Sequence, residues 1–344
     1  MQYQFQFRRY HLPFRAPVRT AHGPWAEREG VLVRLENATG RVGYGEAAPI
    51  PWFGSETVDE IEAACGELGA NVDDTRLDTV PARLGCLRNA LNVAREDRED
   101  GKVAPKQAHL AVAAMLPAGR AVLAQIASRA EAGFRVFKWK VGVGDLADEL
   151  GLLDDVCAAL PDGAKLRLDA NGGWDRRQAE RWLERCAERP VEFVEQPAFA
   201  QASEGAARMS KTEDLLRGLA EDFPTPIALD ESVSGDADVA RWLELGWQGV
   251  FVVKPSLLGN VPATLARLAK AKASVVFSSA LETRLGAQAA LRTAFDWSGA
   301  PRALGFGVWP LFADGRFDGP YAGPFLHADD VERINPEAVW NALS

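Results

Sequence analysis

The feature that most constrains the fold is a series of short apolar runs, each of which ends in an ionisable residue. Helix-like stretches separate the runs, whose terminal residues are Lys140, Asp169, Glu195, Asp230 and Lys254. A (β/α) barrel keeps its catalytic side chains at the C-terminal ends of successive parallel strands. One such run would mean little, but the ordered series predicts a parallel barrel with its chemistry at one end.

Strand-like and helix-like segments alternate from about residue 107, and this alternation is typical of a parallel sheet. The gaps read as helices, and residues 175–189, for example, open with an acidic residue in the first turn. Eight strands within roughly 200 residues favour an α/β fold with a closed barrel over an open sheet. The expected strands cover residues 109–116, 134–141, 166–170, 191–196, 227–231, 249–254, 274–279 and 303–307.

The first hundred residues predict a smaller α+β module. Residues 30–46 alternate like a hairpin that turns at 37–40. Residues 56–70 and 80–96 carry small and apolar residues at helical spacing, and residues 1–7 alternate like an edge strand. Both kinds of element are therefore expected before the barrel begins.

These patterns divide the chain into an α+β capping domain over residues 1–105 and a catalytic barrel over residues 106–307. The charged stretch 95–102 is expected as an exposed crossing between the two. Residues 308–344 are rich in proline, glycine and aromatic residues, and we expect them to pack back on the N-terminal module.

Composition excludes several classes of protein. The net charge is -9 over 344 residues, whereas a nucleic-acid surface requires a basic patch or stripe. No run approaches the roughly 20 apolar residues of a membrane span, and the N-terminus lacks the layout of a signal peptide. The cysteines show no CxxC spacing, which predicts buried, reduced thiols and a cytoplasmic protein. They are Cys65, Cys86, Cys157 and Cys186.

The ring of charged residues suits metal-assisted acid–base chemistry. Lys138 and Lys140 lie two apart on one expected strand, so both would point into the barrel mouth and depress each other's pKa, as a general base requires. Asp169, Glu195 and Asp230 end separate strands, and converging carboxylates suit Mg²⁺, with Mn²⁺ as a substitute. Taken singly, each residue could instead be a solvated lysine or a helix-capping carboxylate.

Lys254 arrives from the opposite side of the ring, and the proline that follows it ends the strand while the amine stays in the mouth. Two lysine positions that flank a metal suit abstraction of a proton next to a carboxylate. Asn171 and Glu231 follow strand ends and either support the metal ligands or cap helices. The four histidines are scattered, and there is no P-loop or complete dinucleotide motif.

The motifs around these residues resemble the enolase superfamily, specifically its muconate lactonizing enzyme subgroup. The resemblance covers nearly the whole chain and implies a TIM-like (β/α)₇β barrel with an α+β N-terminal capping domain. Within that subgroup, residues 277–283 and 303–307 are most similar to the o-succinylbenzoate synthase family. The motifs are Lys138-Trp139-Lys140, Leu168-Asp169-Ala170-Asn171, Val194-Glu195-Gln196-Pro197, Leu229-Asp230-Glu231-Ser232 and Val253-Lys254-Pro255.

The resemblance implies an Mg²⁺-dependent hydro-lyase that converts 2-succinyl-6-hydroxy-2,4-cyclohexadiene-1-carboxylate to o-succinylbenzoate through an enediolate, in menaquinone or phylloquinone biosynthesis. It implies that the three strand-end carboxylates bind the metal. Lys140 would remove the α-proton and then protonate the departing hydroxyl, while Lys254 would stabilise the enediolate. Lys138 would tune Lys140 and contact the substrate carboxylate.

The same resemblance indicates which residues contact the small carboxylate substrate. Ser278 and Ser279 would lie near the succinyl tail. Trp25 and Trp52 belong to the segments Thr20-Ala21-His22-Gly23-Pro24-Trp25 and Pro49-Ile50-Pro51-Trp52-Phe53-Gly54, which match the cap loops that close over the site in this family. Packing between the domains is the alternative role for both tryptophans.

Other activities and states stay open. Muconate cycloisomerases and N-succinylamino acid racemases share the metal ligands and both lysine positions, and a racemase requires proton exchange at Lys140 and at Lys254. Dipeptide epimerases are disfavoured because residues 305–310 lack the aspartate pair that such enzymes usually carry. A catalytically inactive barrel that acts as a binding protein is disfavoured because the key positions keep competent residues. The chain could act as a monomer or as a homo-oligomer.

Overall fold

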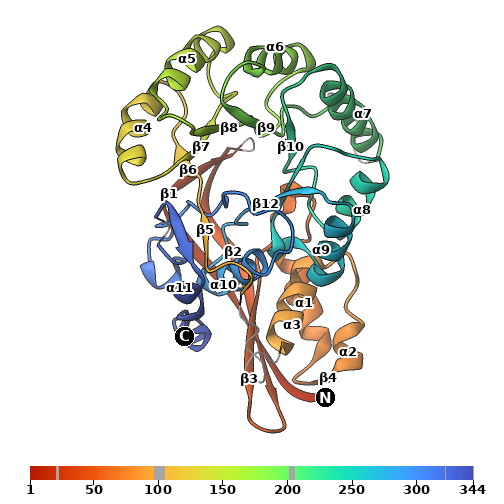
Figure 1. The fold of residues 1–344 in the computed structure, drawn as a ribbon. Helices are drawn as coiled ribbons and strands as arrows, with labels where there is room; N and C mark the ends of the chain where they lie inside the picture. Colours follow the sequence, from red (N-terminus) through yellow and green to blue (C-terminus); the bar gives the residue numbers. More distant parts are fainter. Residues whose placement is uncertain (21–22, 97–104, 201–205, 322, 344) are drawn as a thin grey trace.

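The chain forms a curled parallel sheet surrounded by helices, beside an elongated antiparallel sheet (Figure 1). The structure, a computed structural model, describes residues 1–344 except 21–22, 97–104, 201–205, 322 and 344. Most of the expected crossing at 95–102, and Ala21 and His22 of the first cap loop, therefore lie outside the described residues.

In the described part of the chain, seven parallel strands form the barrel sheet, and a helix follows each strand, as expected from the alternating pattern. The strands are β6 (Ala114–Leu116), β7 (Val136–Lys140), β8 (Lys165–Asp169), β9 (Val191–Glu195), β10 (Ile227–Leu229), β11 (Val250–Val253) and β12 (Ser274–Phe277). The helices are α4 (Ala121–Glu131), α5 (Leu146–Ala159), α6 (Arg176–Cys186), α7 (Ala206–Asp222), α8 (Asp236–Glu244), α9 (Val261–Lys270) and α10 (Arg284–Phe295), with the 3₁₀ turn η2 (Pro255–Leu257) after β11.

The expected eighth strand at 303–307 closes the barrel through isolated bridges rather than as a regular strand. Leu304 pairs in parallel with Val112, and Gly305 pairs in parallel with Ser278. The Leu304 amide donates to the Ala111 carbonyl at 2.8 Å, and the Gly305 amide donates to the Phe277 carbonyl at 2.8 Å. One short segment thus bonds to both edges of the seven-stranded sheet.

The prediction of a single strand at 109–116 is wrong, because the structure has two strands there. Residues His109–Ala111 form a separate strand, β5, which pairs antiparallel with β13 (Phe325–His327). The backbone changes partner between β5 and β6, where the Val112 amide donates to Pro324 and the Ala113 amide donates to Leu304. The apolar run is continuous in sequence, but its two halves serve different sheets.

The N-terminal sheet has the strand order β3-β2-β1-β4. The expected hairpin is confirmed, and its turn is held by a 2.9 Å bond from the Asn37 amide to the Arg41 carbonyl. The N-terminal strand is not an edge strand at its start, because residues 2–4 of β1 pair with β4 while the opposite side of β1 pairs with β2. The strands are β1 (Gln2–Thr20), β2 (Gly23–Asn37), β3 (Val42–Ala47) and β4 (Asn71–Asp73).

Helices cover one face of this sheet, with η1 (Pro51–Phe53) before them and α2 (Asp74–Asp78) between the two longer ones. The helix expected at 56–70 is α1 (Val58–Leu68), which begins at a capping box between Thr57 and Glu60. The helix expected at 80–96 is α3 (Gly85–Arg95), which packs on β3.

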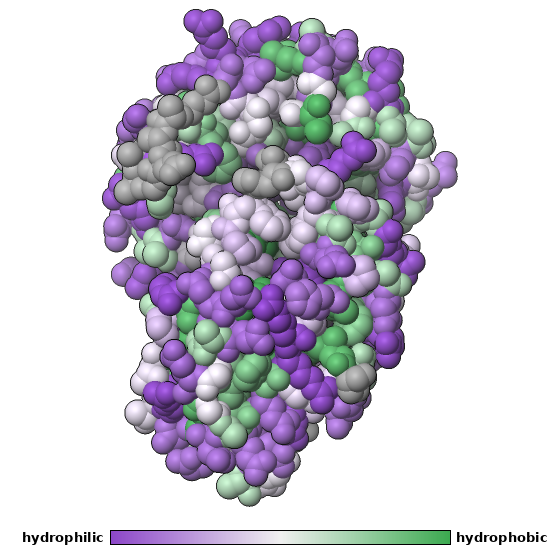
Figure 2. All heavy atoms as spheres, turned by 180° about the vertical axis from the view of Figure 1, so that it is seen from behind, coloured by the Kyte–Doolittle hydropathy of each residue, from purple (hydrophilic) through white to green (hydrophobic). Residues whose placement is uncertain are grey.

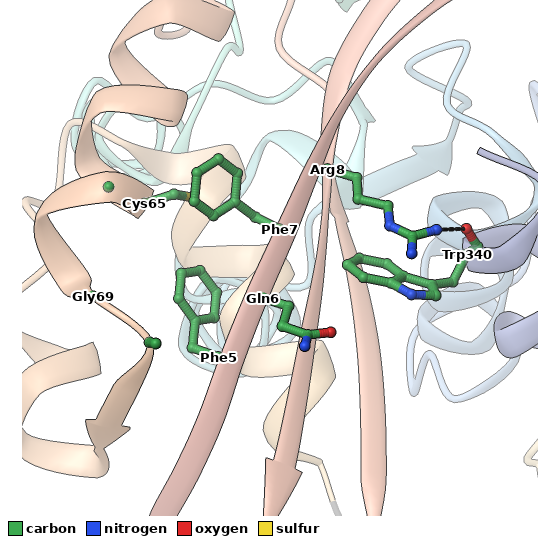
Figure 3. A pocket seen from close by; sticks show the side chains of 9 residues that line it. Phe5, Gln6, Phe7, Arg8, Cys65, Gly69 and Trp340 are labelled. Atoms are coloured by element: carbon green, nitrogen blue, oxygen red, sulfur yellow. Dashed lines mark hydrogen bonds between the residues drawn. The ribbon is translucent and has the colours of Figure 1, made fainter. Parts of the chain in front are cut away.

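The C-terminal residues return to the antiparallel sheet, where they form η3 (Gly315–Phe317), α11 (Ala328–Glu332) and α12 (Pro336–Asn341). Arg8 of β1 donates a 2.7 Å hydrogen bond to the Trp340 carbonyl and lies 4.3 Å above the Trp340 ring. Figure 3 shows this contact on one side of β1, with Phe5, Phe7 and Cys65 on the other. These contacts bring the C-terminal segment against the N-terminal sheet, as expected, while the domain boundaries at 105/106 and 307/308 stay a prediction.

Side chains alternate between the inside and the outside of each barrel strand. Trp139 is fully buried and packs edge-on against Trp182 of α6, with ring centroids 6.2 Å apart, so its neighbours Lys138 and Lys140 face the barrel interior. A small apolar cluster of Phe193, Ala228, Val250, Val252 and Val276 fills that interior. The interior below the charged strand ends is therefore mostly apolar, and it also holds the buried Arg167, whose guanidinium lies 4.9 Å from the centre of the Phe193 ring.

The surface and the thiols agree with an ordinary globular protein. Hydrophilic residues dominate the face seen from behind, with hydrophobic residues in scattered patches (Figure 2). Among the helices that the structure describes, none has the length and apolar character needed to cross a membrane. All four cysteines are free, and Cys65, Cys86 and Cys186 are buried.

Candidate active site

The strand register brings the predicted site residues together at one end of the barrel. Lys140, Asp169 and Glu195 are direct neighbours across β7, β8 and β9. Asp230 follows β10 and Lys254 follows β11, so both continue the ring. The three carboxylates are nearly fully buried, with exposures of 7%, 2% and 5% in chain order.

Lys138 lies between two of the carboxylates. Its Nζ is 2.9 Å from Asp169 Oδ2 and 2.7 Å from Glu195 Oε1. Burial alone would lower the pKa of Lys138, but the negative charges of Asp169 and Glu195 outweigh it and raise this pKa. The expectation that the two lysines of β7 depress each other's pKa is therefore wrong for Lys138, which is held in its charged form.

Lys140 has a different environment from its neighbour two residues earlier. Its Nζ donates a 2.6 Å hydrogen bond to the Arg19 carbonyl of β1, and the structure records no ion pair for it among the described residues. Burial lowers the pKa of Lys140, the charges of Asp169 and Glu231 oppose this shift, and the charge of Lys138 adds to it. The net lowering favours the neutral amine that a base requires.

Lys254 is buried on the other side of the ring, against Asp230. Its Nζ also lies 4.8 Å from the centre of the Phe53 ring. Burial lowers the pKa of Lys254 to about 7, with the charge of Lys138 contributing in the same direction. A lysine with this pKa exchanges protons readily near neutral pH.

Two polar residues just beyond the strand ends add to the acidic ring. Asn171 Nδ2 donates to Glu231 Oε1 at 3.0 Å, while Asn171 Oδ1 and Glu231 Oε2 are buried without a partner among the described residues. Burial, followed by the charges of Asp169 and Glu195, raises the pKa of Glu231 to about 8. Burial and the Asp169 charge also raise the pKa of Glu195.

The donor set fits a divalent metal ion. Asp169, Glu195 and Asp230 are hard oxygen donors on neighbouring strand ends. All three carboxylates are buried, and a cation between them would offset their mutual repulsion, which adds to the effect of burial in raising the pKa of Glu195. Among the described residues, however, no three acidic, histidine or cysteine side chains are close enough to form a ready-made metal group. Ammonium groups of Lys138 and Lys254 lie against these carboxylates instead.

Ser278 and Ser279 follow β12 and are both buried at the same end of the barrel. The Ser278 hydroxyl donates to the Gly305 carbonyl at 3.2 Å, which links this residue to the closing segment. The Ser279 hydroxyl donates to Glu282 Oε2 at 3.1 Å. Burial, and next the charge of Glu46, raises the pKa of Glu282 to about 7.

Trp25 and Trp52 contact each other edge to face, with ring centroids 4.6 Å apart. Trp25 is partly buried, whereas Trp52 remains 36% exposed. Their neighbour Phe53 reaches Lys254, so the second cap loop touches the ring of charged residues. The two tryptophans thus pack together within the cap, next to the site rather than inside its ring.

Sequence reasoning missed Gln196 and Phe53. Gln196 adopts a left-handed backbone (φ 37°), and its side-chain oxygen accepts hydrogen bonds from the amides of Asp230 and Ser232. It thereby fixes the loop that carries the Asp230 carboxylate. The available signals were the position of Gln196 directly after Glu195 and that of Phe53 in the expected cap loop, next to Trp52.

A separate hollow of about 450 Å³ lies away from this ring, in the antiparallel sheet. Figure 3 shows its lining side chains on both sides of β1, with Arg8 and Trp340 on one side and Phe5 and Phe7 on the other. It contains none of the charged strand-end residues. We assign the chemistry to the barrel mouth, because the buried acids and lysines converge there.

Two family models match the chain. The model described as "Enolase C-terminal domain-like" matches residues 121–320, which include the whole ring from Lys138 to Lys254. The model described as "MenC, N-terminal domain" matches residues 2–83. With the capped barrel, the first match defines the class: this is an enzyme of the enolase superfamily, which confirms the resemblance and the fold class inferred from the sequence.

Individual relatives narrow the class. The o-succinylbenzoate synthase of Thermosynechococcus vestitus is 38% identical over 311 residues, which cover 89% of this chain and 92% of that protein. The crystal structure of o-succinylbenzoate synthase from Thermosynechococcus elongatus, with Mg in its active site, has a TM-score of 0.80 at 34% identity, covering 98% and 99% of the two chains. The chain belongs to the o-succinylbenzoate synthase family.

The fold is shared more widely than this family. The N-succinyl Arg/Lys racemase of Bacillus cereus has the same TM-score of 0.80 at only 16% identity, over 99% of this chain and 98% of that one. At that identity the likeness concerns the fold alone. The capped barrel therefore does not select one reaction, and the choice depends on site residues.

Proposed function

We propose that the chain dehydrates 2-succinyl-6-hydroxy-2,4-cyclohexadiene-1-carboxylate to o-succinylbenzoate, with Mg²⁺, as a step of menaquinone or phylloquinone biosynthesis. The observation that carries the proposal is the placement of Lys140 and Lys254, whose strands are four places apart in the barrel order, on either side of the buried carboxylates. Membership of the o-succinylbenzoate synthase family supports this substrate over those of the racemases and cycloisomerases, which share the same ring of residues.

In the proposed reaction, the neutral Nζ of Lys140 takes the proton from the carbon next to the substrate carboxylate. The ammonium form of Lys140 then gives that proton to the departing hydroxyl, so the C–O bond breaks and one water leaves. The protonated form of Lys254 stabilises the negative charge of the enediolate. Mg²⁺ held by Asp169, Glu195 and Asp230 would supply further positive charge beside the substrate carboxylate.

The remaining site residues orient the substrate in this proposal. Lys138, charged and fixed between two carboxylates, adds a positive charge beside Lys140 and the substrate carboxylate. Ser278 and Ser279 lie at the end of β12, where their hydroxyls could face the succinyl group. Trp25 and Trp52 close the cap side and reduce access of water.

The test is turnover of 2-succinyl-6-hydroxy-2,4-cyclohexadiene-1-carboxylate by purified protein, first with Mg²⁺ and then with EDTA. We expect o-succinylbenzoate to form only with the metal, and its formation to return when Mg²⁺ is added back. Equal turnover in EDTA would contradict the metal assignment. The absence of turnover with saturating Mg²⁺ would contradict the proposed substrate.

A second candidate is racemization of N-succinylamino acids. It is favoured by the pKa of Lys254, which burial lowers to about 7, because a racemase needs a second lysine able to exchange a proton. Exchange of the α-hydrogen for deuterium in both enantiomers of an N-succinylamino acid would support it. Retention of the α-hydrogen in both would exclude it.

We further propose that Mn²⁺ substitutes for Mg²⁺, since hard oxygen donors accept both ions. The four free thiols support a reducing, cytoplasmic location, and the net charge of -9 argues against a nucleic-acid partner. Metal titrations that compare the two ions, and cell fractionation, test these points.

A further inference from the structure

A buried arginine joins the segments that surround the candidate site. Arg28 of β2 is only 1% exposed, and its guanidinium donates hydrogen bonds to five backbone carbonyls. The structure records no ion pair for it among the described residues. Its acceptors are the carbonyls of Glu29, Ala48, Pro49, Ala280 and Leu281.

These carbonyls belong to two loops that are far apart in sequence. Ala48 and Pro49 lead into η1, which carries Trp52 and Phe53, and the bond from Arg28 to Pro49 is 2.7 Å long. Ala280 and Leu281 directly follow Ser278 and Ser279, and the bond from Arg28 to Leu281 is 3.1 Å long. One cation therefore ties the second cap loop to the loop after β12.

The first cap loop meets the same cation. The guanidinium carbon of Arg28 lies 5.1 Å from the centre of the Trp25 ring, and Trp25 in turn packs edge-on against Trp52. Phe53 then contacts Lys254 Nζ at 4.8 Å. Contacts through Trp25, Trp52 and the adjacent Phe53 thus connect Arg28 to Lys254, the lysine proposed to stabilise the enediolate.

The loop after β12 has a strained backbone that Arg28 helps to hold. Leu281 has a positive φ of 58°, which is unfavourable for a branched residue. Its amide donates to Ser279 Oγ at 2.9 Å, and Ser279 donates to Glu282. The amides of Ala280 and Leu281 donate to the side chains of Glu282 and Ser279, and the carbonyls of the same two residues accept hydrogen bonds from Arg28.

We propose that Arg28 is a positioning residue for substrate binding, which fixes Trp25, the loop 48–54 and the loop 278–282 against one another. The inference rests on the proposed function of this site and deepens it. A planar group with five N–H donors can reach carbonyls of separate segments, whereas a lysine has three donors around a point charge. Burying a cation without a carboxylate partner is costly, and an apolar side chain would fill the same space without that cost. The arginine is therefore explained better by the five carbonyls that it holds.

The experiment compares Arg28→Lys with a matched control, Arg8→Lys. Arg8 lies on the neighbouring strand, donates to the Trp340 carbonyl and covers a tryptophan ring, and within the described part of the chain it has no hydrogen bond to either site loop. We expect Arg28→Lys to raise KM for the proposed substrate about tenfold and to change kcat by less than about threefold, while Arg8→Lys changes neither. A loss of folded protein alone would lower the apparent kcat and leave KM unchanged.

Hydrogen exchange measured by mass spectrometry provides a readout that needs no substrate. In Arg28→Lys, peptides that cover 48–54 and 279–283 should exchange faster than in the parent, and they should be unchanged in Arg8→Lys. A wild-type KM together with unchanged exchange in those peptides would overturn the inference, as would an equal KM increase in the control. If the parent protein does not turn over the substrate, the proposed function fails and the exchange data alone decide the role of Arg28.

Discussion

The two inward-facing lysines of β7 show how strongly a residue's partners control its chemistry. Lys138 and Lys140 share a strand and a face, yet Lys138 contacts two carboxylates while Lys140 donates to the Arg19 carbonyl. The pKa of Lys138 is therefore raised and that of Lys140 is lowered. This difference supports Lys140 as the base and Lys138 as a fixed positive charge.

Replacement of Lys140 by alanine should abolish turnover and leave metal affinity largely intact. Loss of a general base typically costs about 10²–10⁴-fold in rate. Among the described residues, the Lys140 side chain has no hydrogen bond or ion pair with a proposed metal ligand, so metal affinity should change little. Steady-state kinetics and Mg²⁺ calorimetry measure the two effects. Lys165→Ala, an exposed lysine at the opposite end of β8, is the control and should keep parental kcat. A Lys140→Ala variant with near-parental kcat would exclude the proposed base.

Glu282 should make the stability of the protein depend on pH. Burial raises the pKa of Glu282 to about 7, so the folded state binds this proton more tightly than the unfolded state does. The resulting stabilisation is complete below the unfolded pKa near 4.5 and is lost as pH rises through about 7. The free energy of unfolding of Glu282→Gln, taken relative to that of the parent, should therefore be about 2–3 kcal/mol higher at pH 8 than at pH 5.

Urea unfolding of the parent and of Glu282→Gln at both pH values measures this difference. The glutamine keeps an oxygen that can accept from Ser279 and Ala280, so the turn it holds is preserved. An equal effect of the substitution at pH 5 and pH 8 would show that Glu282 does not titrate in this range.

At the scale of elements, closure of the barrel depends on a segment that is too irregular to count as a strand. Residues 303–307 bond to both sheet edges through Leu304 and Gly305, although they form only isolated bridges. A Cβ on Gly305 would lie 2.5 Å from Ser278 Oγ, so only glycine permits this close approach. The closing segment and the proposed substrate-binding serine are thus coupled.

Gly305→Ala should push Ser278 away from the closing segment. We expect a loss of about 1–3 kcal/mol in the free energy of unfolding, as for other overpacked sites, and a higher KM for the proposed substrate. Chemical denaturation and steady-state kinetics measure the two effects. Gly151→Ala is the control, because that glycine lies within α5 with no atom near its missing Cβ, and alanine should stabilise the helix slightly. A parental KM in Gly305→Ala would argue against a role for Ser278 in binding.

Strands and helices could be predicted where a segment with one local pattern also keeps the same neighbouring strands along its length. The barrel strands that end in Lys140, Asp169 and Glu195 have apolar runs bounded by helix signals, and the structure places them as expected. The run at 109–116 failed because hydrophobic periodicity cannot show that a strand changes partner midway. Its first half pairs with residues more than 200 positions later in the chain.

At the scale of the whole molecule, the two ends of the chain are joined on the antiparallel sheet. Trp340 is buried to 5% exposure against Arg8, and it lies 6.0 Å from the Tyr44 ring. Trp340→Ala should therefore lower the free energy of unfolding by about 3–5 kcal/mol. Because Trp340 is remote from the barrel mouth, KM should be unchanged for the molecules that stay folded.

Denaturant unfolding and kinetics on the folded fraction test this expectation. Tyr321→Ala is a suitable control, since Tyr321 is 81% exposed and its loss should change stability by less than about 0.5 kcal/mol. A Trp340→Ala variant as stable as the parent would show that the C-terminal segment contributes little to the fold.

The sequence by itself determined the strand ends and the residue types placed there, because strand period, helix signals and the position of a charge after an apolar run are local properties. It therefore predicted the barrel, the ring from Lys138 to Lys254 and the family. Only the tertiary structure decided that Lys138 is held by two carboxylates, that 303–307 pairs through isolated bridges rather than as a regular strand, and that Arg28 joins two loops. The sequence had already placed a strand at 303–307, and the structure added that this segment closes the barrel through isolated bridges. All these features depend on contacts between residues far apart in the chain, and no local pattern encodes which distant segment supplies the partner.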